Sequence, residues 1–289
     1  MAEYRRRTAA LALLLGCTSA LAACSPAGHS AADKGGDGPR TTAVFTPRRP
    51  LGEERLRQTA DLMRRRAEGF GLRDVEVRAA GGKVTVSARV AASQQLAAEQ
   101  LASLGRPAVL VLRPVVAVAP AADEGPSAPA GAGAAEFRAL DCSVAAGRTD
   151  HQRGDGERAV ACSTDVADGV RSKYLLDPVA LNGTEISSAE AVFDRQDGTG
   201  WQIQLRLTAA GARTFQDVTG RLAGRTSPTN QFAMVLDGAV LSAPAVNQAI
   251  PGGTAVITGN FTRASAALLA AQISGGSLPT PMDVSSMTR

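Results

Sequence analysis

The chain has 289 residues, a formal net charge of +4, and 44% hydrophobic but only 3% aromatic residues. This length allows two modest domains, each with its own core of alanine, valine and leucine. Basic chains can bind nucleic acid, but here the arginines are scattered and aromatic side chains are few, which argues against that function.

The first 23 residues have the features of a secretory signal peptide. Three arginines at positions 5–7 precede an apolar segment that is too short to span a membrane dependably. Residues 21–24 read Leu-Ala-Ala-Cys and match the lipobox of bacterial lipoproteins, whose cysteine receives a diacylglyceryl group. We therefore expect lipidation of Cys24 and anchoring on the outer side of the cell membrane. The alternative is an ordinary signal peptide that contains a cysteine by chance.

Cysteine usage fits that location. Cys17 would leave with the signal peptide and Cys24 would carry lipid, so Cys142 and Cys162 remain. Outside the cytoplasm two remaining thiols usually pair, and we expect a disulfide between them. A metal site is the alternative, but these cysteines and the nearby His151 provide too few ligands.

The sequence offers few residues from which a catalytic site could be formed. The other histidine of the chain is His29, in the N-terminal tether, so a Ser-His-Asp or Cys-His site lacks its base. We expect no catalytic residue, no metal and no cofactor, and therefore not an enzyme.

The pattern of residues 41–118 predicts strand, helix, strand, strand, helix and strand. Leu56, Ala60 and Met63 begin an apolar stripe of the first helix, and a Gly-Gly turn at 81–82 separates the next two strands. The last strand is expected over 108–118. This order is typical of a split βαβ, ferredoxin-like unit.

The second half predicts a mixed α+β domain. A short strand is expected at 137–140, a hairpin across Asp197–Gly198, and a helix that Thr208 caps. Phe193, Trp201, Phe215 and Phe232 are expected in the core, and any of them that proves exposed becomes a candidate contact residue. The expected organisation is a signal peptide (1–23), a flexible tether (24–40), a ferredoxin-like base (41–118), a linker (119–135) and a head (136–289) with a disulfide-pinned loop.

The C-terminal stretch carries a specific pattern. An apolar run at 232–236 is stopped by Asp237–Gly238, which is hairpin-turn chemistry, and a second run at 254–258 is expected to complete the same sheet. A Gly-Asn turn then leads to a helix that Thr262 can cap, before Gly-Gly-Ser-Leu-Pro at 275–279. This order closely resembles the first extracytoplasmic domain of SecD, the accessory subunit of the Sec protein-export machinery.

The base resembles the same domain more loosely. Arg66 and Gly71 occupy the places of an arginine and a glycine in SecD, whereas Val90-Ala91-Ala92 stands where SecD has Pro-Gly. The resemblance implies an α+β fold with a ferredoxin-like base and a mixed head.

The resemblance also implies a function. It predicts an accessory in protein export that binds emerging unfolded polypeptide or a Sec component outside the membrane. In SecD this domain leads into transmembrane helices that use the proton gradient, and we expect the mature chain here to have no such helix and no proton coupling. The alternatives are a lipoprotein that binds a small ligand or envelope component, and a scaffold that docks to another envelope protein, each reusing the fold.

Overall fold

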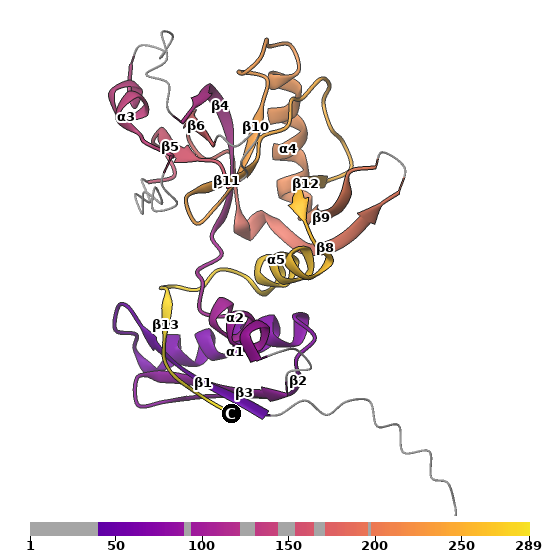
Figure 1. The fold of residues 1–289 in the computed structure, drawn as a ribbon. Coiled ribbons are helices and arrows are strands. Elements are labelled where there is room, and N and C mark those ends of the chain that lie inside the picture. Colours follow the sequence, from indigo (N-terminus) through magenta and orange to yellow (C-terminus); the bar gives the residue numbers. More distant parts are fainter. Residues whose placement is uncertain (1–39, 90–93, 122–130, 144–153, 165–170, 196–197) are drawn as a thin grey trace, which may run out of the picture. The chain divides into compact units, whose positions relative to one another are not determined.

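A computed structural model describes residues 40–89, 94–121, 131–143, 154–164, 171–195 and 198–289 (Figure 1). These residues form an α+β fold with three antiparallel sheets, as the sequence predicts. Within these ranges no helix has the length and apolar character needed to cross a membrane.

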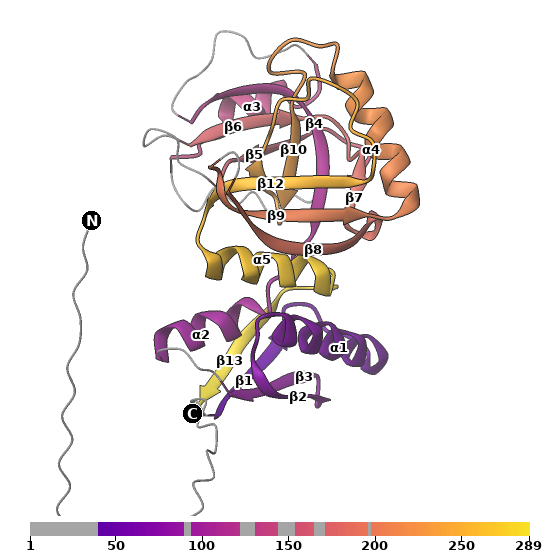
Figure 2. The ribbon, with the colours of Figure 1, turned by 90° about the vertical axis from the view of Figure 1, so that its right-hand side faces the viewer.

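The base subdomain contains one sheet with the strand order β13-β1-β3-β2, which is the ferredoxin-like order of a split βαβ unit. Helices α1 and α2 lie on the same face of this sheet (Figure 2). The elements of the base are β1 (Arg40–Pro47), α1 (Glu53–Gly69), β2 (Arg73–Ala80), β3 (Lys83–Arg89), α2 (Gln94–Ser103) and β13 (Met282–Thr288).

The apolar stripe of α1 packs into the base core as predicted. Leu56, Ala60 and Met63 are buried against the valines of β3, with Met63 fully inaccessible. The first turn of α1 is acidic and its last turn contains Arg66, which suits the helix dipole.

The strand expected at the end of the base forms, but in a different sheet. β4 (Leu110–Pro120) pairs with β10 on one side and with β6 and β7 on the other. The fourth strand of the base sheet is instead β13, which pairs with β1 from the far end of the chain. The head is therefore inserted between α2 and β13. Periodicity could not show this, because a buried apolar strand has the same pattern in either sheet.

The head subdomain contains the other two sheets. The six-stranded sheet has the order β11-β10-β4-β6-β5 with β7 beside β4, and the three-stranded sheet has the order β12-β9-β8. The remaining elements are α3 (Ala134–Ala139), β5 (Ala159–Cys162), β6 (Ser172–Leu176), β7 (Leu181–Asn182), η1 (Gly183–Glu185), β8 (Ile186–Asp194), β9 (Gly200–Leu207), α4 (Ala209–Leu222), β10 (Phe232–Leu236), β11 (Ala239–Ser242), β12 (Thr254–Phe261) and α5 (Arg263–Gly275).

Several local predictions for the head are confirmed. The Thr208 side chain accepts a hydrogen bond from the backbone of Gly211 at the start of α4, and Thr262 accepts one from Ser265 at the start of α5. Asp237 and Gly238, both with positive φ, join β10 to β11. The helices α4 and α5 bury their apolar faces in the largest core of the head.

Three local predictions for the head are wrong. Residues 137–140, expected as a strand, form most of the short helix α3 and its C-cap. The runs at 232–236 and 254–258 lie in separate sheets. The Gly-Asn pair at 259–260 continues β12 rather than turning the chain. In each case tertiary packing overrides a weak local signal.

The six-stranded sheet curls until its two outer strands meet at one end. Ser163, next to β5, forms a parallel bridge with Val240 of β11, and the Thr164 N–H donates to the Val240 carbonyl at 2.8 Å. The enclosed face carries a small apolar core that includes Val115, Ala161 and Val235.

Arg66 joins the base to both chain segments that lead into and out of the head. Its side chain is fully buried, and its guanidinium donates to the carbonyls of Leu104 at 3.1 Å, Pro107 at 2.9 Å, Arg106 and Gly276. Burial lowers the pKa of Arg66 to about 10, which still leaves it charged at neutral pH. The positive charge is therefore held by carbonyl dipoles of the two crossing segments.

We expect Arg66→Ala to lower the free energy of unfolding by about 3 kcal/mol or more, because it leaves several buried carbonyls without a donor. Arg65→Ala is the matched control, since Arg65 is the exposed neighbour on the same helix, and its effect should stay within about 0.5 kcal/mol. Urea unfolding followed by circular dichroism measures both. Equal effects of the two substitutions would contradict this role of Arg66.

Candidate functional site

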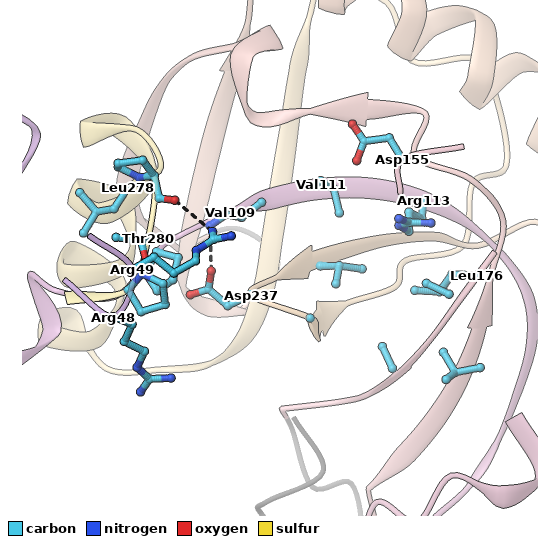
Figure 3. A pocket seen from close by; sticks show the side chains of 18 residues that line it. Arg48, Arg49, Val109, Val111, Arg113, Asp155, Leu176, Asp237, Leu278 and Thr280 are labelled. Carbon is cyan, nitrogen blue, oxygen red and sulfur yellow. Dashed lines mark hydrogen bonds between the residues drawn. The ribbon is translucent and has the colours of Figure 1, made fainter. Parts of the chain in front are cut away.

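A groove of about 720 Å³ opens on the enclosed face of the six-stranded sheet, beside the segments that connect head and base (Figure 3). Its walls come from β4, β5, β6 and the β10–β11 turn, and from residues 278–281 of the segment that leads to β13. This volume is within the range of ligand-binding pockets.

The floor of the groove is apolar. Val111, Leu176 and Val235 line it together with the small side chains of Ala159 and Ala161. Val111 lies on the enclosed face because β4 alternates, with Leu110 and Leu112 turned to the main core of the head. A ligand in the groove would therefore contact aliphatic side chains and exposed strand backbone.

Asp237 forms one end of the groove and has a structural role there. Its carboxylate accepts from the backbone N–H of Val109 at 2.9 Å (Figure 3) and of Ala108 at 3.2 Å, and its own N–H donates to the Val109 carbonyl at 3.0 Å. The sequence identified Asp237 as a turn residue. It gave no signal for this second role, because the partners are backbone groups far away along the chain.

The arginines that line the groove also form hydrogen bonds or an ion pair with other residues of the chain. Arg113 is nearly buried and donates to the carbonyls of Glu157 at 2.8 Å and Asp177 at 3.1 Å. Burial lowers the pKa of Arg113, and the nearby Asp155 opposes that shift.

At the rim, Arg48 forms an exposed ion pair with Asp283, with Nε and Oδ2 3.0 Å apart. Arg49 donates to the Pro279 carbonyl at 3.4 Å. The side of the groove nearest the base therefore carries two arginine side chains.

The structure joins Cys142 to Cys162 by a disulfide, with the Cα atoms 5.6 Å apart and both residues buried. The bond connects the chain after α3 to the last residue of β5, beside the groove. Cys24, His29 and His151 lie outside the described residues, so their predicted roles stay predictions. Within the described ranges no group of three potential ligands could hold a metal ion.

The four aromatic residues expected in the core divide into two pairs. Phe215 and Phe232 are buried and stacked, with ring centroids 5.9 Å apart. Phe193 is 48% exposed, so the prediction that it lies in the core is wrong. It lies near the end of the edge strand β8 and packs edge-to-face on the half-buried Trp201 at 5.3 Å, while the Arg263 guanidinium lies 5.9 Å from the Trp201 ring.

Comparison with known proteins identifies what this domain is related to. Residues 161–280 match the P1 head subdomain of SecDF. The chain is homologous to the periplasmic P1 domain of SecD and SecDF proteins. The homology extends beyond the head, because a crystal structure of SecDF in a super-membrane-facing form covers 86% of this chain and 30% of its own, with a TM-score of 0.57 and 26% identity.

A second solved structure gives the same result. It comes from work on SecDF as a membrane component that enhances protein export, and it covers 86% of this chain and 99% of its own chain, with a TM-score of 0.55 and 26% identity.

Sequence relatives match shorter stretches. The SecD subunit of Streptomyces coelicolor is 41% identical over 157 residues, which are 53% of this chain and 27% of that protein. The SecDF subunit of Thermus thermophilus is 40% identical over 109 residues, which are 38% of this chain and 14% of that protein. This chain therefore matches about a quarter or less of the length of these two relatives.

We expect the Cys142–Cys162 bond to form in the native protein and to stabilise it by about 3 kcal/mol on the chain-entropy model. The variant with both cysteines replaced by alanine should lose that amount in urea unfolding. Alkylation of the unreduced, unfolded protein followed by mass spectrometry should leave both cysteines unlabelled. Labelling of both without prior reduction would contradict the pairing.

Proposed function

We propose that this protein is a lipid-anchored accessory of protein export that binds emerging unfolded polypeptide, or a Sec component, outside the membrane. The observation that carries the proposal is its homology to the P1 domain across both head and base, since its relatives are subunits of the protein translocase. An extracytoplasmic domain of this family meets its partners on the outer side of the membrane, which agrees with the signal sequence.

The protein is proposed to act by contact alone, as neither an enzyme nor a proton-coupled motor. Two surfaces of the head can make that contact. The groove offers an apolar floor, and the exposed Phe193 beside Trp201 offers an aromatic contact on a different sheet.

The proposed anchor rests on the lipobox at residues 21–24 and on the tether that follows it. A diacylglyceryl group carries two acyl chains, and two chains hold a protein on a bilayer where one gives only marginal binding. The tether lets the folded domain reach polypeptide at some distance from the membrane.

A second candidate function is an envelope lipoprotein that holds a small ligand or serves as a scaffold. The groove has a volume of about 720 Å³, which is within the range of pockets that bind small molecules and so supports this candidate. Native mass spectrometry of the protein purified from its own membrane distinguishes the two, because a retained small molecule would support the ligand-binding role.

We expect a photo-crosslinking residue at Ala159, on the lip of the groove, or at Phe193 to capture chains in the course of export or a Sec component in living cells. Gln58 is the control position, since it lies on the exposed side of α1 in the base. Immunoprecipitation and mass spectrometry identify the products. Equal capture from all three positions, or none from any, would count against the export role.

We expect Cys24→Ser to abolish acylation and release the protein from the membrane. Labelling of cells with palmitate and fractionation of membranes measure both effects. Cys17→Ser is the control, because Cys17 lies within the segment that the signal peptidase would remove. An unlabelled, membrane-free wild-type protein would contradict the anchor.

A further inference from the structure

β5 forms one lip of the groove and has a strand neighbour on only one side for most of its length. It pairs with β6 through the register from Ala159–Leu176 to Cys162–Lys173. Among the described residues, its backbone pairing with a strand on the other side is confined to the end of β5, where Ser163 and Thr164 meet Val240 of β11. From that end toward Ala159, the edge of β5 faces the groove.

The hydrogen-bond pattern between β5 and β6 determines which backbone groups of β5 point toward the groove. The Ser163 N–H donates to the Ser172 carbonyl at 2.8 Å, so odd-numbered residues of this strand form hydrogen-bonded pairs with β6. In an antiparallel pair these alternate with residues whose N–H and C=O point away from the partner. Val160 is such a residue, and it lines the groove.

The opposite side of the groove leaves room beside this edge. β10 and the Asp237–Gly238 turn form that side, and in the part of the chain that the structure describes, the backbone of β11 pairs with the β5 segment only where Val240 meets Ser163 and Thr164. The opening is therefore a gap in a curled sheet, bounded by a strand edge and floored by aliphatic side chains.

The polar side chains of the groove favour a ligand that is recognised through its backbone. Asp237 is engaged by two backbone N–H groups, and Arg113 by two backbone carbonyls. Arg48, Arg49 and Asp155 also line the groove. Away from these charged side chains, the groove offers the backbone edge at Val160 and an apolar floor. An extended polypeptide matches both, because its backbone can pair with the edge while alternate side chains meet the floor.

We propose that the groove binds an extended segment of an exported polypeptide as an added β-strand, hydrogen-bonded along β5 through the backbone of Val160. The ligand class rests on the function proposed above, whereas the strand pairing rests on the geometry of β5. Small and aliphatic side chains face Val111, Leu176 and Val235, and the alternate side chains face solvent. Binding of this kind depends little on the amino-acid sequence of the bound polypeptide.

The direct test is amide hydrogen exchange of the full-length protein in detergent, measured with and without reduced, carboxymethylated α-lactalbumin as a permanently unfolded polypeptide. We expect exchange at the Val160 amide to slow about tenfold on binding, as an added hydrogen bond predicts. The Ala161 amide, which already pairs with β6, is the internal control and should stay unchanged.

Substitution at the same residue provides a second measurement by fluorescence anisotropy. Val160→Pro removes the outward N–H without removing a bond to β6, and proline is tolerated at such edge positions. We expect it to weaken binding about tenfold, the effect of one hydrogen bond. Val160→Ala keeps the N–H and should bind within about twofold of the wild type.

The outcomes separate the two proposals. If the polypeptide binds but Val160 gains no protection and Val160→Pro binds normally, strand addition is wrong while the export role stands. If the polypeptide does not bind and no crosslink forms in cells, the export role itself fails. If the Val160 amide is protected before any ligand is added, a segment of this chain occupies the edge and the strand-addition proposal is overturned.

Discussion

The placement of the head on the base depends on one buried cation. Arg66 sits on a helix of the base, yet its guanidinium donates to carbonyls of the segment that enters the head and of the segment that returns from it. No methyl group fits beside it, because a Cβ on Gly275 would lie 2.5 Å from the Arg66 Cγ. Burying a charge without compensation is costly, so both segments must stay close to this side chain.

The insertion of the head explains why such a constraint is needed. The base sheet is complete only when β13 returns from the head and pairs with β1. The two connecting segments run side by side, with the Leu278 N–H bonded to the Pro107 carbonyl and the Met282 N–H to the Gly105 carbonyl. Gly105 is required there, because a Cβ would lie 2.1 Å from the Met282 carbonyl oxygen. These segments also line the groove, so the network around Arg66 fixes part of its wall.

The sequence predicted those parts of the structure that short-range physics determines. The α1 stripe, the Gly81–Gly82 turn, the Asp237–Gly238 hairpin and the threonine caps of α4 and α5 all follow from contacts within a few residues. The order of the predicted elements indicated an α+β fold with a ferredoxin-like base, and the resemblance to SecD implied the same fold class.

The features that the sequence could not predict depend on contacts between residues far apart in the chain. A continuous apolar strand such as β4 suits either sheet, and only the pairing of β13 with β1 decides between them. Phe193 was expected in the core because aromatic residues usually are buried, but the end of an edge strand leaves its ring half uncovered. Arg66, Arg113 and Asp237 bind distant backbone groups, and a backbone partner has no side-chain identity that a sequence pattern could reveal.

The difference between binding backbone groups and binding side chains also bears on how the protein would recognise its partners. Exported polypeptides have no sequence in common, but every unfolded chain presents the same backbone N–H and C=O groups. A site that bound mainly through charged side chains would select for particular sequences, and here Arg113 and Asp237, two of the charged residues that line the groove, bind the protein's own backbone. A strand edge above an aliphatic floor discriminates instead by conformation, because a folded protein has already paired its own strands and cannot present an extended segment. Recognition by conformation is the property that a contact between an export accessory and an emerging, unfolded chain requires.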